Sequence, residues 1–312
     1  MAGLRVARRA RTMPADRRFT RRAMALGALA AAPAIAQPGA ISIVASFSIL
    51  ADMARALAPP ELNVAALVVP GGDAHVFEPR PANARQVAQA HMLIVNGLGF
   101  DPWAERLAQG VGFKGRLVRA AGAVQPLQAS HDHGHSHDSD PHAWQDAAQA
   151  RLYARAISGG LTTLLPAKAA ALTARAVAYD GALQALDRDI RTTLAPIPPD
   201  RRVLVTGHSS MNYFARAYGL RILAAKGLST ASEPSAAQIA RLIRQIREQK
   251  IAAVFLDTLK DPRLIERIQA ETGARTGGKL FADSLSPPGG PAPTYVAMMR
   301  HNAQTIAAAL TA

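Results

Sequence analysis

A long helical stretch near the middle of the sequence constrains the fold more than any other feature. Residues 167–195 are rich in Ala, Leu and Arg, with apolar positions at helical spacing. Pro166 precedes this stretch and the segment PIPP (196–199) follows it, and prolines stop helices. A helix of this length would extend about 44 Å. We therefore expect a stiff connection that fixes the distance between the two parts of the chain and limits hinge motion.

Short apolar runs rich in β-branched residues alternate with longer amphipathic segments on both sides of this helix, a pattern typical of βα units and mostly parallel sheets. We predict an α/β fold with an N-terminal lobe over residues 37–165, a linking helix over 166–196 and a C-terminal lobe over 197–312. The predicted strands cover residues 41–47, 63–69 and 91–97 in the first lobe, and 202–207, 220–225, 252–257 and 277–282 in the second.

The first 36 residues have the pattern of an export signal. They contain eight arginines and one aspartate, followed by an apolar run over residues 23–32 and a small-residue cleavage site that ends at Ala36. The run is shorter than the ~20 residues needed to span a bilayer, so we expect cleavage after Ala36 rather than a membrane anchor. Two arginine pairs, 17–18 and 21–22, allow a twin-arginine route, and the Sec route remains open.

Charge and cysteine content narrow the classes of partner. The signal segment accounts for half of the formal net charge of +14, and the remaining charges are scattered without an aromatic-rich basic motif, so we expect no nucleic-acid partner. The sequence has no cysteine. We therefore expect a soluble periplasmic protein without a lipid anchor, in which only imidazoles and carboxylates can bind a transition metal. We also expect this protein to be a monomer.

Three histidines occupy similar places in different parts of the sequence. His75 and His208 each follow a predicted strand, and His142 lies in the segment DPHAW just before a predicted helix. Ligands of open α/β sheets gather at the carboxyl ends of strands. One histidine at such a place is weak support for a site, but three favour a metal centre.

A carboxylate completes this set. Asp283 follows the last predicted strand, and three imidazoles with one carboxylate form a tetrahedral site that suits Zn²⁺ and a binding rather than a catalytic role. The alternative for Asp283 is to cap the next turn with its side chain. Asp73 and Glu78 are alternative ligands, or residues that orient the imidazole of His75.

The remaining histidines fall into two groups. Those of the segment 131–139 alternate with Asp, Gly and Ser in a stretch too polar to pack, and we expect them to form an auxiliary low-affinity metal site or a solvated loop: His131, His133, His135 and His137. His91 opens a predicted strand and His301 lies in a terminal helical segment, so we interpret both as structural.

An ordered series of motifs resembles a known family. GGDAHVFEPRP, NGLGFDPW, DPHAW, GHSSMNYFARAYGL, STASEPSAAQIARLIRQI and MMRHNAQTIAAAL, spread over residues 41–310, resemble the zinc-specific solute-binding proteins of ABC importers, the ZnuA-like members of the cluster A-I (TroA-like) group. The resemblance implies two α/β lobes joined by one long rigid helix, with the metal at their interface. It implies His75, His142 and His208 as ligands and Asp283 as the closing carboxylate, whose place a water takes in some zinc members.

The resemblance also implies the cargo and the partners. Manganese and iron relatives typically have a carboxylate at the third position, so His208 indicates zinc. We expect a non-enzymatic protein that captures Zn²⁺ in the periplasm and delivers it to a membrane permease with a cytoplasmic ATPase, since the chain itself has no P-loop. The alternatives are a manganese or iron carrier of the same family, a zinc-dependent hydrolase and a periplasmic zinc buffer.

Overall fold

Four parallel strands form the sheet of the N-terminal half. The computed structural model describes residues 41–128, 139–257 and 263–312, and the proposed signal segment lies outside them. The strands lie in the order β2-β1-β3-β4, so the first strand is central and Ile43 pairs with both Val64 and Met92. Their bounds are β1 Ser42–Phe47, β2 Asn63–Val68, β3 Met92–Val95 and β4 Arg116–Arg119. The side chains of β1 and β3 are almost wholly buried because helices cover both faces of the sheet.

The helices of this half follow the strands in βα order. Proline is the first residue of α2 and of α3. At this position a backbone N–H would make no hydrogen bond within the helix, so proline loses none. A short 3₁₀ turn, η2, precedes α4, and the side chain of Asp146 caps α4 by accepting from the backbone of Ala148. The bounds are α1 Ser48–Leu57, α2 Pro81–Ala88, α3 Pro102–Gly110, η2 Ala143–Gln145 and α4 Ala147–Leu164.

The C-terminal half repeats the βα pattern with two parallel pairs of strands, β5-β6 and β7-β8, and β5 lies beside β7. A capping box of Ser235 and Gln238 begins α7. The strands are β5 Val203–His208, β6 Arg221–Lys226, β7 Ala253–Asp257 and β8 Arg275–Leu280. The helices are α6 Asn212–Tyr218, α7 Ala236–Glu248, α8 Arg263–Thr272 and α9 Tyr295–Thr311.

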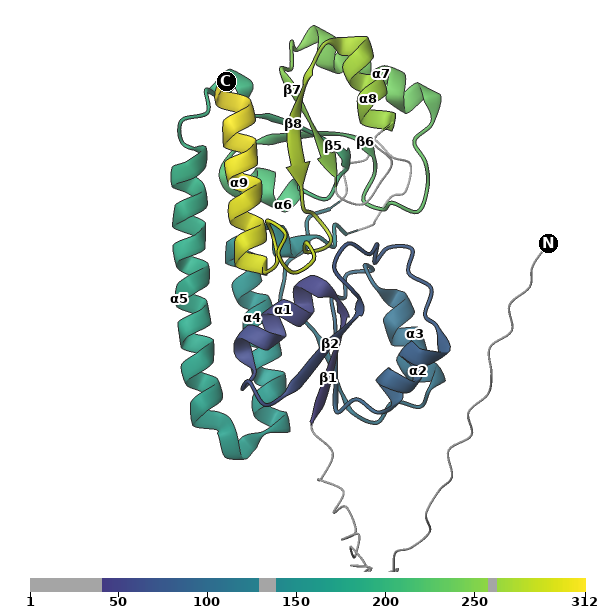
Figure 1. Cartoon of the computed structure of the whole chain (residues 1–312), viewed down its shortest axis with the longest axis vertical. Coiled ribbons are helices and arrows are strands. Elements are labelled where there is room, and N and C mark those ends of the chain that lie inside the picture. Colours follow the sequence, from purple (N-terminus) through teal and green to yellow (C-terminus); the bar gives the residue numbers. More distant parts are fainter. Residues whose placement is uncertain (1–40, 129–138, 258–262) are drawn as a thin grey trace, which may run out of the picture. The chain divides into compact units, whose positions relative to one another are not determined.

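One long helix leads from the first half to the second. After a 3₁₀ turn over Pro166–Lys168, α5 runs through the 26 residues Ala169–Leu194, about 39 Å. It packs on α4, α9 and α1, and Figure 1 shows it alongside both halves. Its buried side chains lie on one face: Leu172, Leu183, Leu186, Ile190 and Leu194. The predicted α/β fold with parallel sheets and a long connecting helix is confirmed.

Every predicted strand is present, but β4 was not predicted. Its sequence, RLVR, has two apolar residues between arginines, and it pairs with β3 on one side only. Such a short edge strand lacks the apolar run that identifies buried strands. The last strand also begins and ends two residues earlier than the predicted 277–282.

The buried core continues from the first half into the second. One cluster of buried apolar side chains includes residues of β1, β3, α4, α5 and α9, and a smaller cluster lies between the sheet of the C-terminal half and α7 and α8. The chain from Ala40 to Ala312 is one compact unit. The carboxyl ends of the strands therefore lie within a single packed body.

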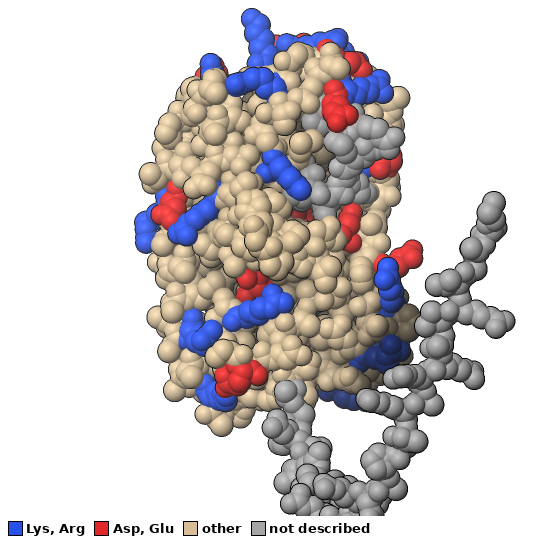
Figure 2. Space-filling view, viewed as in Figure 1, with Lys and Arg blue, Asp and Glu red and all other residues tan. Residues whose placement is uncertain are grey.

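Charged side chains are dispersed over one face of the molecule. On the face shown in Figure 2, Lys and Arg stand among uncharged surface with Asp and Glu between them, and the described residues of that face form no continuous basic stripe. Among the described residues, none of the helices combines the length and the apolar content that crossing a membrane requires.

The buried face of α5 generates a stability prediction. Leu186 is fully buried, whereas the side chain of Val177 on the same helix is 68% exposed. Leu186→Ala should lower the free energy of unfolding by about 2–5 kcal/mol because it removes buried methyl groups and leaves a cavity. Val177→Ala is the matched control and should change it by less than about 0.5 kcal/mol. Denaturant unfolding of residues 37–312 measures both, and equal effects would contradict the packing described for α5.

Candidate metal centre

Four side chains from distant parts of the chain meet at one point. His75 lies in the loop after β2, His142 lies immediately before η2, and His208 is the last residue of β5. Asp283 follows just beyond the end of β8. All four were predicted from the sequence, and one possible ligand atom from each lies within 4.8 Å of the others. Three of them follow the carboxyl ends of β2, β5 and β8, and His142 comes from the turn before α4.

The distances between these atoms suit a tetrahedral cation. Nε2 of His208 lies 2.8 Å from Oδ2 of Asp283, and Nε2 of His75 lies 3.4 Å from the same oxygen. Nε2 of His142 lies 3.3 Å from Nε2 of His75 and 3.6 Å from Oδ1 of Asp283. Ligand atoms placed about 2.0–2.1 Å from a central zinc would be about 3.3 Å apart. Three of the four distances, 3.3, 3.4 and 3.6 Å, are close to this spacing, and the fourth, between His208 and Asp283, is that of a hydrogen bond.

Burying these four ionisable side chains together costs free energy, which a bound cation would offset. The side chains of His142 and Asp283 are fully buried, and those of His208 and His75 are 2% and 5% exposed. Oδ1 of Asp283 has no hydrogen-bond partner among the described residues. A buried carboxylate oxygen without a partner carries a large desolvation cost, which a cation beside it would offset. The side chain of Asp283 faces the imidazoles, so the alternative role as a turn cap is not what the structure shows.

The electrostatics keep Asp283 ionised. Burial by itself would raise the pKa of Asp283, but when the imidazoles carry protons the positive charge on His208 and His142 and the hydrogen bonds from His208 and His75 outweigh burial and hold this pKa well below its usual range. The carboxylate therefore stays ionised as the pH falls and the imidazoles become protonated.

Asp140 orients His142, and the sequence reasoning missed it. Its Oδ1 accepts the backbone N–H of His142 at 2.9 Å and lies 2.8 Å from Nδ1 of the same residue. Because an ionised carboxylate only accepts hydrogen bonds, Nδ1 carries the proton and Nε2 presents its lone pair to the cluster. The signal was present in the motif DPHAW, in which the aspartate stands two positions before the histidine.

The acidic residues near His75 have other roles. Oδ1 of Asp73 accepts the backbone N–H of His75 at 3.0 Å, and Oδ2 accepts the hydroxyl of Thr230 at 2.8 Å. Asp73 therefore holds the loop that carries His75 and is not in the four-residue cluster. Glu78 is exposed and also lies outside the cluster.

Of the other histidines, the structure describes His91 and His301, and both have partners outside this centre. Nδ1 of His91 accepts the backbone N–H of Ser42, and Nε2 of His301 lies 3.0 Å from the carbonyl oxygen of Lys279. The segment with His131, His133, His135 and His137 lies outside the described residues. Its flanks are described: Gln128 and Ser139 form a β-bridge, and the N–H of Asp140 donates to the carbonyl of Leu127.

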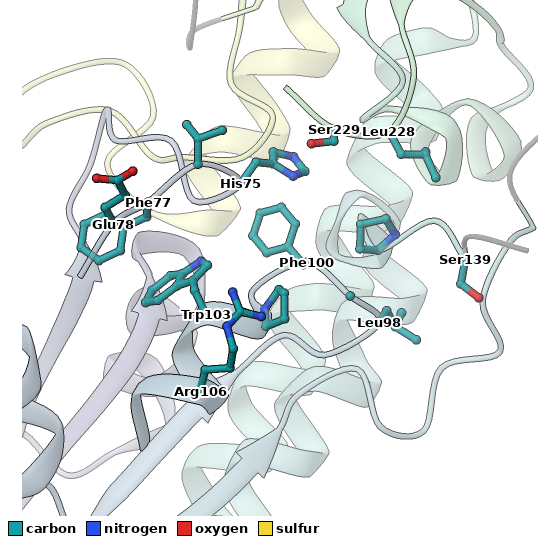
Figure 3. A pocket seen from close by; sticks show the side chains of 14 residues that line it. His75, Phe77, Glu78, Leu98, Phe100, Trp103, Arg106, Ser139, Leu228 and Ser229 are labelled. Atoms are coloured by element: carbon teal, nitrogen blue, oxygen red, sulfur yellow. The ribbon is translucent and has the colours of Figure 1, made fainter. Parts of the chain in front are cut away.

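A pocket of about 690 Å³ adjoins His75, the most exposed of the four side chains. Figure 3 shows the imidazole of His75 beside Phe100, with Leu228 and Ser229 of the C-terminal half across from it. The ring centroids of His75 and Phe100 are 4.6 Å apart. His75 lines the pocket, so the cluster borders the pocket on this side.

Three buried tyrosines hold the segment that carries His142. The hydroxyl of Tyr213 donates to the carbonyl of Asp140, and that of Tyr295 donates to the carbonyl of Trp144. Tyr153 donates to the side chain of Asn96, whose amide in turn donates to the carbonyl of Pro141. Burial raises the pKa of each of the three tyrosines, so all three hydroxyls keep their protons and remain donors.

The same segment is tied to the residue before Asp283. The indole N–H of Trp144 and the side-chain amide of Gln145 both donate to the carbonyl of Ala282, at 2.9 and 2.6 Å. The backbones on either side of the centre are thus fixed to each other.

This fold and this cluster are found in known proteins. The family model described as "Zinc-uptake complex component A periplasmic" matches residues 43–309. The chain belongs to this family. Its members are extracytoplasmic, metal-binding solute-binding proteins of ABC importers, and they are not enzymes.

Relatives of the chain are named for different metals. It is 31% identical to the zinc-binding protein TroA of Treponema pallidum over 274 residues, 86% of this chain and 88% of TroA. It is 30% identical to the iron-binding protein YfeA of Yersinia pestis over 265 residues, 85% of each chain. It is also 30% identical to the manganese-binding lipoprotein MntA of Halalkalibacterium halodurans over 271 residues, 87% of this chain and 89% of MntA.

Solved structures show the same architecture. The periplasmic zinc-binding protein TroA of Treponema pallidum matches with a TM-score of 0.82 and 29% identity, over 88% of this chain and 100% of the TroA chain. A manganese-bound periplasmic metal-binding protein of Candidatus Liberibacter asiaticus matches with a TM-score of 0.78 and 27% identity, over 86% of this chain and 99% of the other. The chain is therefore a metal-binding protein of an ABC importer with a buried site of three histidines and one aspartate.

The contact between Asp140 and His142 generates the second prediction. Asp140→Ala should weaken metal binding by about 10–100-fold, because His142 then loses the acceptor that fixes its tautomer and ring orientation. Competition with a chromophoric chelator measures the affinity. Asp200→Ala, which removes an exposed aspartate in the turn before β5, is the control and should leave the affinity unchanged. An unchanged affinity in Asp140→Ala would contradict the role described for Asp140.

Proposed function

We propose that this protein captures Zn²⁺ in the periplasm and delivers it to a membrane permease driven by a cytoplasmic ATPase. The proposed ligands are Nε2 of the three imidazoles and a carboxylate oxygen of Asp283. The observation that carries the proposal is the convergence of three imidazole nitrogens and the carboxylate of Asp283, whose possible ligand atoms all lie within 4.8 Å of one another. Imidazole-rich tetrahedral sites suit zinc, whereas the harder Mn²⁺ prefers oxygen ligands and a higher coordination number.

Asp283, rather than a water, closes the proposed coordination shell. Its Oδ1 is buried and has no hydrogen-bond partner among the described residues, which supports a cation as its partner. A shell closed by protein leaves no position for the activated water that a zinc hydrolase uses. This agrees with the non-enzymatic character of the family.

We propose that the mature protein is a soluble monomer released after cleavage at Ala36, with lobes over 37–165 and 197–312 and the linking helix over 166–196. The absence of cysteine supports a protein without the lipid anchor that the name of MntA implies for that relative. We further propose that His131, His133, His135 and His137 bind zinc weakly beside the main site. Deleting residues 130–139 should leave one tight zinc per chain.

Uptake in cells tests the function. A strain without this protein should lose uptake of radiolabelled zinc under chelation, and the native chain should restore it while His142→Ala should not. If zinc uptake is unchanged in the strain that lacks the protein, the protein is a zinc buffer and the proposal is contradicted. Restored uptake of manganese or iron, but not of zinc, identifies the alternative carrier.

The choice of metal generates a third prediction. Affinity generally rises from Mn²⁺ to Zn²⁺ at any one site, so tighter zinc binding alone does not identify the cargo. His208→Glu should lower the ratio of zinc to manganese affinity at least about tenfold, which corresponds to ~1.4 kcal/mol, because an oxygen ligand replaces an imidazole. Calorimetric competition between the two ions measures the ratio. An unchanged ratio, or tighter manganese binding by the native protein, would exclude the proposed selectivity.

The fourth prediction concerns pH. Imidazoles bind metal only when neutral, so zinc affinity should fall as the pH decreases through about 6.5, where free imidazole titrates. The lowered pKa of Asp283 means that the carboxylate stays ionised over this range and does not cause the fall. Affinity measured between pH 8 and pH 5, with a chelator whose own protonation is corrected for, checks this. A constant affinity would argue against histidine ligation.

A further inference from the structure

Two neighbouring side chains of the C-terminal half contact the segment that carries His142. Asn212 and Tyr213 begin α6, and both contact Asp140, which lies 72 and 73 positions earlier in the sequence. His142 itself belongs to the N-terminal half of the chain. The contact therefore joins a candidate ligand of one half to a helix of the other.

Asn212 holds the carboxylate of Asp140. Its side-chain amide donates to Oδ2 of Asp140 at 3.0 Å and to the carbonyl of Ser209 at 3.1 Å. Oδ1 of the same carboxylate accepts from His142. With its amide anchored to the turn after β5, Asn212 fixes the rotation of the carboxylate and keeps Oδ1 directed at the imidazole.

Tyr213 holds the backbone at the same residue. Its hydroxyl accepts the N–H of Leu127 at 2.9 Å and donates to the carbonyl of Asp140 at 3.1 Å. The side chain is fully buried, and burial raises its pKa, so the hydroxyl remains protonated. One hydroxyl thus holds both backbone segments that flank residues 129–138.

We propose that Asn212 and Tyr213 are positioning residues for metal binding. They act through Asp140 and hold His142 in the tautomer whose Nε2 lone pair faces the metal. This inference rests on the proposed function, because it assigns to His142 the role of a ligand. The unit formed by β5 and α6 then serves the site twice: His208 of β5 supplies a ligand directly, and Asn212 and Tyr213 of α6 position a second ligand from the other half.

The physical reason is the rotational freedom of the carboxylate and the imidazole. Without Asn212, Oδ2 of Asp140 loses its donor in a buried place and the carboxylate can turn away from His142. An imidazole without a fixed acceptor at Nδ1 exchanges between tautomers, and the other tautomer presents a proton to the metal. The loss should appear as weaker binding and altered ligand geometry, even where the fold is intact.

Asn212→Leu and Tyr213→Phe test this in the chain of residues 37–312. Each should weaken zinc binding by about 10–100-fold, as residues that orient a metal-bound histidine typically do. Each should also change the visible absorption spectrum of the Co²⁺-loaded protein, which reports ligand geometry, and the ¹⁵N shifts that report the tautomer of His142 in the metal-free protein. Tyr218→Phe is the matched control. Tyr218 is a buried tyrosine of the same helix, and none of the described hydrogen bonds joins its side chain to Asp140. It should leave all three readouts unchanged.

A double-mutant cycle separates positioning from a general loss of stability. If Asn212 acts through Asp140, Asn212→Leu should cause no further loss of affinity in a chain that already carries Asp140→Ala. Additive losses, or native affinity, Co²⁺ spectrum and tautomer in both single variants, would overturn the inference. Melting temperatures show which variants are folded at the temperature of the assay.

His142→Ala distinguishes failure of this inference from failure of the proposed function. If this variant loses tight binding while Asn212→Leu and Tyr213→Phe keep it, the positioning role is wrong and the ligand assignment stands. If His142→Ala binds zinc as tightly as the native chain, the ligand assignment itself is wrong and the inference falls with it.

Discussion

The immobilised segment of residues 140–145 is the constraint on which the metal centre depends. Its carbonyl groups are held by tyrosine hydroxyls of α6 and α9 and, through Asn96, by a tyrosine of α4. Each of these donors is buried and remains protonated. Any other conformation of the segment would leave a buried donor or acceptor without its partner, which costs free energy. The observed conformation is therefore favoured. The imidazole of His142 therefore has a defined position before any metal arrives.

The centre unites the two halves of the chain. His75 and His142 come from the first half, and His208 and Asp283 come from the second. A bound metal therefore joins the two halves of the chain. Two side-chain contacts near the centre also run from one half to the other. Asp73 reaches Thr230, and Asp140 reaches Asn212, across the same boundary. Such an arrangement favours a site that is organised in advance, in which few groups must be ordered when the ion binds.

The sequence predicted much of the fold and the four members of the cluster, because both depend on local patterns. Apolar runs identified the strands, and the places where those strands end identified His75 and His208. β4 was not predicted because this edge strand contains only two apolar residues and therefore no such run. Tyr213 was not predicted for a different reason: its role arises from hydrogen bonds to backbone atoms that only the folded chain brings near. Asp140 contacts a residue two positions away, and the motif DPHAW contained its signal. A pattern of residue types does not show which carbonyl a buried hydroxyl will reach.

The carbonyl of Ala282 has a further consequence for the rigidity of the centre. Two donors, from Trp144 and Gln145, occupy both of its lone pairs. A peptide group held twice cannot rotate without breaking both bonds, so the backbone that leads into Asp283 is locked. His142 is locked in the same way by its own neighbours. The loop of His75, the most exposed of the four side chains, borders the pocket, and Asp73 ties this loop to Thr230 of the second half.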